Sequence, residues 1–275
     1  MRIQIGAAQF GNSYGITNQR KVLTLRESWD ILDLSLSYGI TEVDTAPSYG
    51  DSFSTIAKYS GGVLNVTSKI MIKGLRASEI NNLINSQIEQ IGNLHSLKTI
   101  LIHDFAELHE SDLEVLAEVA QQTKTVKIGV SIYEPWELGL AKTYLGSSGT
   151  IQFPANILNQ GCLEAIGSPE LATYQLVARS LMLQGALDWE FEGNPFRRHS
   201  SITKIRDFSV SQGLRPIEIV IAFAKQLSAD YILFGFNSKH QLKEFLNIWN
   251  ANLNVNIDFK EYRSTDAKLI DPRKW

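Results

Sequence analysis

Residues 39–50, GITEVDTAPSYG, join the end of a helix to a short strand and a turn rich in small residues. The strand, Glu42–Asp44, ends in an aspartate, and Tyr49 follows five positions later. Such a pair has a structural interpretation as well as a chemical one, because a strand-end aspartate can cap a helix and a tyrosine can pack in a core. The neighbouring segments decide between the two.

Short apolar runs alternate with longer segments of helical period on both sides of this stretch. This alternation is typical of parallel strands connected by helices. Eight strands are enough to close a barrel, so the sequence predicts an α/β fold, a (β/α)₈ TIM barrel, as a single domain over residues 1–275. The expected strands are Arg2–Ala7, Glu42–Asp44, Leu64–Lys69, Thr99–His103, Lys127–Val130, Thr150–Phe153, Gln175–Arg179 and Tyr231–Phe234.

Apolar residues at steps of three and four positions predict helices on the outside of this barrel. A polar stretch, Asp188–Ser201, is expected to form a long loop after the seventh strand, where loops often cover barrel sites. The less regular tail, from Ala251 to Trp275, is expected to pack across the barrel surface. The expected helices are Leu25–Ser37, Ile80–Ile91, Leu113–Ala120, Pro216–Leu227 and His240–Trp249.

Two further strands end in residues that can carry chemistry. The strand after Tyr49 ends in Lys69, and the next one ends in His103. Alone, either residue would be read as a solvated charge or a satisfied polar group. In a barrel, however, the carboxyl ends of the strands converge on one face, so the joint pattern favours one shared site. Lys73 is the alternative lysine, four positions beyond the first.

The segments around Asp44, Tyr49, Lys69 and His103 resemble the corresponding strand ends of the aldo-keto reductase family. The resemblance extends over nearly the whole chain. It implies a catalytic quartet made of these four residues, in an NAD(P)H-dependent enzyme that reduces an aldehyde or ketone to an alcohol. A sugar-derived carbonyl is one candidate substrate.

The chemistry of carbonyl reduction gives each member of the quartet a role. A developing alkoxide needs a proton donor, and Tyr49 is the expected general acid. An unperturbed tyrosine has a pKa of about 10, so a nearby ammonium that favours the phenolate brings the acid closer to the working pH. Lys69 is expected to supply this ammonium, and Asp44 to hold it. His103 is expected to hydrogen-bond the carbonyl oxygen or to relay the proton.

The resemblance also implies residues that hold the cofactor. Ser131 and Gln152 match positions that bind the carboxamide of nicotinamide, and both side chains can donate and accept hydrogen bonds. Arg179 stands near the position of an aromatic residue that stacks on the nicotinamide in many relatives. Its guanidinium can stack on a ring or serve as an ion-pair partner. Ser180 and Gln184 are expected near the pyrophosphate.

The segment that opens the last helix is expected to hold the phosphate and adenine end of the cofactor, because backbone N–H groups at a helix start suit an anion. Many relatives carry an arginine at the position of Gln241, which contacts the 2′-phosphate of NADP. Gln241 has no charge, and Lys239 is a candidate to compensate. NADP(H) is favoured over NAD(H), and no Gly-x-Gly-x-x-Gly turn of a Rossmann domain is present. The expected contacts are Gly235, Asn237, Ser238, Lys239 and Gln241.

Composition narrows the partners to a small-molecule carbonyl substrate. The formal net charge of −3 gives no broad attraction for nucleic acid or an anionic membrane surface. A single cysteine, the absence of a signal-peptide pattern and the lack of a long apolar run favour a cytoplasmic protein. The five histidines lack the spacing of a metal site. Trp136, Trp189 and Phe191 are candidate walls for the substrate.

Two other functions compete with carbonyl reduction. Because a fold does not establish an activity, a regulatory protein that binds a nicotinamide cofactor with little turnover is the main alternative. A phosphate-binding barrel isomerase or lyase ranks last, since it leaves the quartet unexplained.

Overall fold

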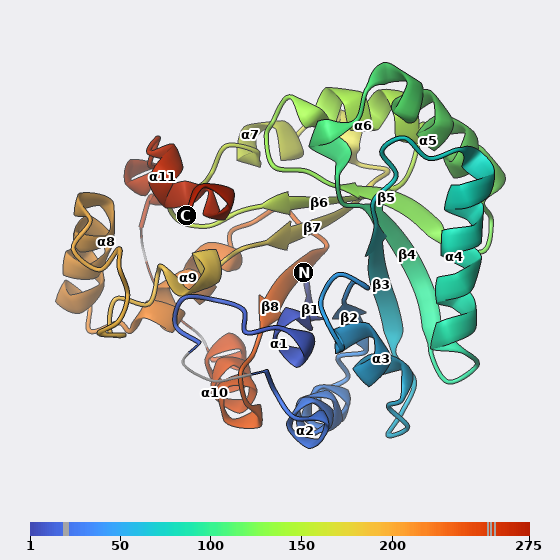
Figure 1. Cartoon of the computed structure of the whole chain (residues 1–275). Coiled ribbons are helices and arrows are strands. Elements are labelled where there is room, and N and C mark those ends of the chain that lie inside the picture. Colours follow the sequence, from blue (N-terminus) through green and yellow to red (C-terminus); the bar gives the residue numbers. More distant parts are fainter. Residues whose placement is uncertain (19–21, 252, 254, 256) are drawn as a thin grey trace.

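The computed structural model describes residues 1–18, 22–251, 253, 255 and 257–275, and within them eight parallel strands close into a barrel (Figure 1). Each strand pairs with the next one in the sequence, and β1 closes the ring against β8. This arrangement confirms the predicted (β/α)₈ barrel. The strands are β1 (Arg2–Gly6), β2 (Glu42–Asp44), β3 (Asn65–Ile70), β4 (Ser96–Ile102), β5 (Lys127–Ser131), β6 (Thr150–Pro154), β7 (Gln175–Arg179) and β8 (Tyr231–Gly235).

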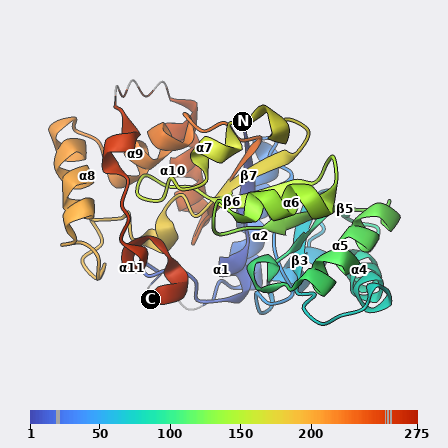
Figure 2. The same ribbon diagram turned by 90° about the horizontal axis from the view of Figure 1, so that it is seen from above.

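The helices form an outer layer around the strands (Figure 2). The longer ones are α2 (Leu25–Ser37), α4 (Ala77–Ile91), α5 (Glu110–Gln122), α6 (Glu137–Leu145), α8 (Ser200–Ser211), α9 (Pro216–Ala224) and α10 (Lys239–Asn250). Short helices are α1 (Ala8–Gly11), α3 (Ser52–Ala57), α7 (Leu163–Ile166) and α11 (Ala267–Ile270). Single 3₁₀ turns are η1 (Phe105–Glu107), η2 (Pro169–Leu171), η3 (Leu183–Gly185), η4 (Phe259–Tyr262) and η5 (Pro272–Lys274).

Acidic side chains three positions into a helix fix several of the helix starts. The carboxylate of Glu27 accepts the backbone N–H of Thr24 at 3.0 Å, and the Thr24 hydroxyl accepts the N–H of Glu27 in return. This reciprocal pair satisfies two N–H groups that have no partner inside the helix. Similar carboxylate bonds open α4, α5 and α9, from Glu79, Asp112 and Glu218.

The registers between strands place the predicted site residues at one end of the barrel. Asp44 lies opposite Gly6 of β1 and Thr67 of β3. Lys69, two positions further along β3, lies opposite Leu101 of β4. Because all eight strands run parallel, their carboxyl ends and the loops that follow them share one face.

The predicted strands agree with the observed ones to within three residues at each end, and α2 has the predicted bounds. Two of the longer helices were not expected. The first, α6, lies between β5 and β6, and the second, α8, begins at Ser200, so the long loop after β7 is two residues shorter than predicted. In α8 only Ile202, Ile205 and Ser209 are buried, which leaves a weak apolar pattern.

The C-terminal tail packs on the barrel, as expected, but it contains short helical turns. The backbone N–H of Ser264 donates to the carbonyl of Leu158 at 2.9 Å, and Gln160 donates to the carbonyl of Phe259 at 2.7 Å. These bonds hold the tail against the segment after β6. Positions 252, 254 and 256 of the predicted tail lie outside the described residues. No helix in the described part of the chain combines the length and apolarity needed to cross a bilayer.

Candidate active site

A cavity of about 530 Å³ opens at the carboxyl ends of the strands. All four members of the predicted quartet line it. Asp44 lies on β2, Lys69 on β3, and His103 directly follows β4, while Tyr49 lies in the loop after β2. The cavity therefore brings together residues that are up to 59 positions apart in the sequence, from Asp44 to His103.

Asp44 and Lys69 form a buried ion pair at the floor of this cavity. The ammonium of Lys69 donates to one oxygen of the Asp44 carboxylate, and both side chains are only 2% exposed. The amide of Gln152 donates to the other carboxylate oxygen at 2.8 Å. Burial opposes the charged ammonium, but Asp44 and Tyr49 outweigh burial and raise the pKa of Lys69. Lys69 is thus held in its charged form.

Tyr49 lies beside this pair on a loop with little freedom. The ammonium of Lys69 lies 5.0 Å from the centroid of its ring. A Cβ atom at Gly11 would overlap the carbonyl oxygen of Tyr49, so only glycine allows the two loops to approach this closely. Gly50 has a φ of +57°, a left-handed conformation that also favours glycine.

Anchoring bonds complete this loop. The hydroxyl of Ser52 donates to the carbonyl of Ala7 at 2.7 Å and lies 2.8 Å from the hydroxyl of Thr45. The loop that carries the tyrosine is therefore tied, through Ser52, to the residues that directly follow β1 and β2.

His103 faces Tyr49 edge to face, with ring centroids 6.4 Å apart and an interplanar angle of 84°. Burial and the neighbouring Lys69 ammonium lower the pKa of His103 to about 4. The imidazole is consequently neutral near pH 7, and it can donate one hydrogen bond without carrying a charge.

Acid is expected to weaken the fold through His103. The unfolded imidazole has a pKa near 6.5, so between pH 6.5 and 4 the unfolded chain binds a proton that the folded chain does not. The free energy of unfolding should therefore fall as the pH drops through this window.

Urea unfolding at pH 7 and pH 4.5 should show a decrease in the free energy of unfolding that is smaller in His103→Asn than in the wild type, by about 2 kcal/mol. His240→Asn, at an exposed histidine of α10, is the control, and an equal decrease in all three proteins would contradict the prediction.

Lys73, the alternative to Lys69, lies outside the cavity. Its side chain is 48% exposed, and its ammonium lies 3.8 Å from the carboxylate of Glu107. The structure thus places Lys69, not Lys73, beside Tyr49.

Comparison with known proteins identifies the family. The sequence model of the Aldo/keto reductase family matches residues 2–266. The chain belongs to the aldo-keto reductase family. Its members are NAD(P)H-dependent oxidoreductases that reduce carbonyl groups. This confirms the family and the enzyme class predicted from the sequence.

Solved structures of aldo-keto reductases share the fold of this chain at low identity. The holo form of an enzyme from Bacillus halodurans is 13% identical, with a TM-score of 0.72 over 100% of this chain and 95% of that chain. Glycerol dehydrogenase from Gluconobacter oxydans is 14% identical, with a TM-score of 0.66 over 94% and 89% of the two chains. A thermostable aldo-keto reductase in complex with the inhibitor epalrestat is 19% identical, with a TM-score of 0.62 over 92% and 90%. A search of curated protein sequences gave no match.

Most of the predicted cofactor contacts of this aldo-keto reductase line the same cavity. Ser131 and Gln152 lie side by side, with the Ser131 hydroxyl donating to the amide oxygen at 3.4 Å. The lining residues among the predicted contacts are Ser131, Gln152, Arg179, Ser180, Gln184, Gly235, Asn237 and Gln241.

Ser238 and Lys239 are not among the residues that line the cavity. Ser238 caps α10, since its hydroxyl accepts the N–H of Gln241 at 3.1 Å. Lys239 is the exposed first residue of that helix. Their predicted cofactor contacts are therefore not supported by position, because the helix start uses one side chain as a cap and leaves the other in solvent.

Arg179 is held in place at the end of β7. Its guanidinium donates to the carbonyl of Ile132 at 2.8 Å and to the hydroxyl of Ser180 at 3.1 Å, and it lies 4.4 Å from the ring centroid of Tyr133. The following turn is strained, because Ser180, Leu183 and Gln184 all have φ between +47° and +62°. Both candidate roles of Arg179, stacking and polar contact, are compatible with this position.

The sequence did not point to several residues that line the cavity. Tyr14 and Tyr133 contribute aromatic walls, while Arg215 and Glu244 form an ion pair at the end near α10. None of them lies at a strand end, so no periodicity marked them; the weak signal was the capping pattern that begins at Arg215.

The three aromatic residues predicted as substrate walls do not line the cavity. Trp136 is 58% exposed on the outside, and Trp189 is buried in the core. Phe191 follows Glu190, which lines the cavity, but is not itself part of the lining. That prediction was wrong, because the loop after β7 points its acidic residues, and not these aromatic rings, toward the site. Within the described residues, no group of histidine, cysteine and carboxylate side chains is arranged to hold a metal ion.

Proposed function

We propose that this aldo-keto reductase reduces an aldehyde or ketone to an alcohol with NADPH, and that Tyr49 donates the proton. The observation that carries the proposal is the buried Asp44–Lys69 pair beside Tyr49 in the large cavity. A charged ammonium in this place favours the phenolate that remains once the proton has left. The neutral imidazole of His103 can meanwhile donate a hydrogen bond to the substrate oxygen, which stabilises the developing alkoxide.

The residues of the cavity fit a nicotinamide cofactor. Ser131 and Gln152 offer a hydroxyl and an amide of the kind that recognises a carboxamide. The amide oxygen of Asn237 is buried without a hydrogen-bond partner in the described part of the protein. A Cβ atom at Gly235 would overlap the side chain of Gln9, so glycine allows these two cavity-lining residues to lie in close contact. The cofactor, when bound, supplies the hydride that attacks the carbonyl carbon.

NADP(H) is the proposed cofactor, and the side chain proposed to bind its 2′-phosphate is that of Arg215, not that of Gln241. The amide oxygen of Gln241 accepts the backbone N–H of Asn237 at 2.8 Å, so this side chain is used within its own segment. The guanidinium of Arg215 lines the same end of the cavity and pairs with Glu244 and, at 3.5 Å, with Glu218. A planar guanidinium is well suited to a phosphate monoester. Arg215 thus replaces, from the start of α9, the arginine that many relatives carry at position 241.

Binding and turnover together test this function. Fluorescence titration is expected to show tighter binding of NADPH than of NADH, and Arg215→Gln should weaken NADPH binding about tenfold while changing NADH binding little. Addition of short aldehydes should then consume NADPH over many turnovers. Tight binding without turnover on any aldehyde or ketone would favour the regulatory alternative, and the absence of any binding would overturn both functions.

A further inference from the structure

A second cavity, of about 270 Å³, lies between the end of β7 and the C-terminal tail. We call it the tail cavity. Four cationic side chains line it, Arg179, Arg263, Arg273 and Lys274, against two carboxylates, Glu134 and Asp271. The tail cavity therefore has two more positive than negative groups, although the whole chain has a net charge of −3.

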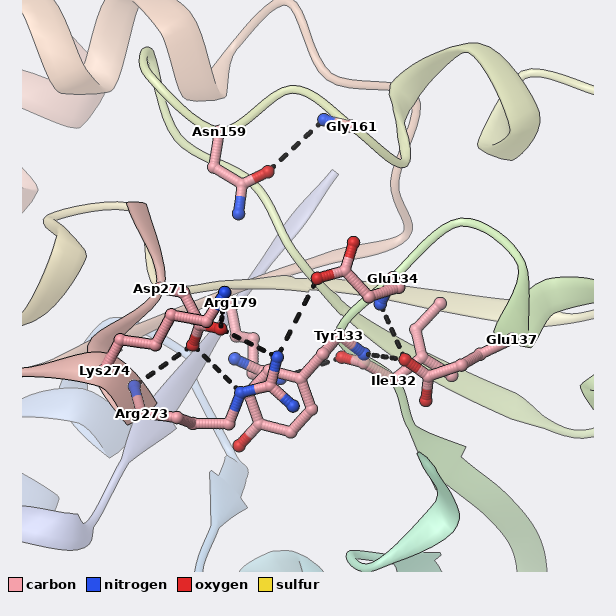
Figure 3. A network of polar contacts seen from close by, with 10 residues as sticks. All are labelled: Ile132, Tyr133, Glu134, Glu137, Asn159, Gly161, Arg179, Asp271, Arg273 and Lys274. Atoms are coloured by element: carbon pink, nitrogen blue, oxygen red, sulfur yellow. Dashed lines mark hydrogen bonds and ion pairs between the residues drawn. The ribbon is translucent and has the colours of Figure 1, made fainter. Parts of the chain in front are cut away.

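The two carboxylates are already used within the tail cavity. Asp271 accepts two hydrogen bonds from Arg273, both 2.9 Å long, and lies 3.9 Å from the ammonium of Lys274 (Figure 3). Glu134 lies 3.8 Å from the same guanidinium of Arg273. Both carboxylates thus compensate Arg273 and Lys274, and neither pairs with the other two cations.

The other two cations, Arg263 and Arg179, have no carboxylate partner among the described residues, and Arg263 is exposed at the cavity. The guanidinium of Arg263 has no hydrogen-bond or ion-pair partner in the part of the chain that the structure describes. Arg179 gives its two terminal nitrogens to Ser180 and Ile132, so it contributes its positive charge to the wall of the tail cavity. A guanidinium without a protein partner is free to form charge-assisted hydrogen bonds to an oxyanion.

The tail cavity shares a wall with the active site. Tyr133, Arg179 and Ser180 line both cavities. The ring of Tyr133 contacts two guanidiniums, that of Arg179 at 4.4 Å and that of Arg273 at 3.8 Å from its centroid. Figure 3 shows these side chains together, from the ends of β5 and β7 and from the tail. A group held in the tail cavity would thus lie beside the substrate end of the active site.

We propose that the tail cavity binds an anionic group, a phosphate monoester or a carboxylate, carried by the carbonyl substrate. Guanidinium groups pair with such oxyanions through parallel hydrogen bonds. Arg263 has donors to give, and Arg179 adds a positive charge to the same wall. This inference rests on the proposed reductase function. It assigns the substrate to the class of anionic carbonyl compounds, with the charged end recognised by the tail and the carbonyl end by the quartet.

Matched aldehydes with and without a phosphate test the proposal. D-Glyceraldehyde is compared with D-glyceraldehyde 3-phosphate, and D-erythrose with D-erythrose 4-phosphate, so that two lengths are covered. In at least one pair the phosphorylated aldehyde is expected to have a kcat/KM about tenfold higher, mainly through KM. Arg263→Gln should remove most of this preference while leaving the neutral aldehyde unchanged.

Lys268→Gln is the matched control. Lys268 lies on the same tail and is exposed, but it does not line the tail cavity. Its substitution removes one positive charge, as Arg263→Gln does. The preference for phosphate should therefore survive in this variant. Equal kcat/KM values within both pairs, or equal losses in the two variants, would overturn the proposal.

Calorimetric titration with inorganic phosphate separates the two sources of the anion. One outcome is that inorganic phosphate binds to the wild type but not to Arg263→Gln, while phosphorylated aldehydes are not preferred. This outcome would indicate a site for a free anion and would refute the substrate assignment. If no aldehyde of any kind is reduced, the proposed function fails. Loss of phosphate binding in Arg263→Gln would still support an anion site in that case.

Discussion

Replacement of Tyr49 by phenylalanine is expected to lower kcat by about 10³-fold, with the fold and the affinity for the cofactor retained. The substitution removes only the hydroxyl, so the ring can keep its edge-to-face contact with His103. Without the hydroxyl, the site loses its proposed acid, while the neutral imidazole of His103 can still donate a hydrogen bond to the substrate oxygen. A loss of this size corresponds to about 4 kcal/mol of transition-state stabilisation.

The measurement is the single-turnover rate at saturating NADPH, with circular dichroism and cofactor titration on the same samples. Tyr38→Phe removes a hydroxyl from an exposed tyrosine at the end of α2 and serves as the control. A kcat of Tyr49→Phe within tenfold of the wild type would refute the assignment of Tyr49 as the proton donor. In that case His103 or a bound water would have to supply the proton.

Substitution of Asp44 by asparagine is expected to destabilise the protein by about 3 kcal/mol and to abolish most of the activity. The carboxylate and Lys69 are both almost fully buried, so the substitution leaves an ammonium in the barrel without its counter-charge. The pKa of Lys69 should then fall, because burial opposes the charged form and the main opposing interaction is lost. Urea unfolding at pH 7 measures the change.

The double variant Asp44→Asn with Lys69→Met separates stability from chemistry. Removal of both charges should recover more than half of the lost stability, since no unpaired charge remains, yet activity should stay as low as in the single variant. Asp30→Asn breaks an exposed ion pair with Arg26 and should change stability little. A stability of Asp44→Asn close to that of Asp30→Asn would contradict the prediction.

The barrel was predictable because each of its strands leaves a local signal. Strands that are covered on both sides form short apolar runs, such as Ile100–Ile102, and glycine or polar residues mark their ends. The sequence failed to predict helices that bury few apolar residues. In α8, serine and charged residues occupy most positions, and only tertiary contacts to the tail reveal the helix.

The gathering of the four proposed catalytic residues in one cavity was predictable for a similar reason, since three of them lie at or next to strand ends and Tyr49 follows a strand closely. Parallel strands bring such residues to one face whatever the loops do. Tyr133, Arg215 and Arg273 could not be found in this way, because their places depend on how loops and the tail fold across the barrel. Side chains proposed to recognise the cofactor phosphate or the substrate therefore leave a weaker sequence pattern than side chains proposed to carry out the reaction.

Gly11 is a position outside the active site at which a mutation is expected to abolish activity. The residue does not line the active-site cavity, and it lies at the end of α1, in a separate loop from Tyr49. Even so, the smallest side chain there would push against the backbone that carries the tyrosine. A missense change to alanine at this codon would leave every catalytic side chain in the sequence and still behave as a loss-of-function allele. Inspection of the active-site residues alone would miss its cause.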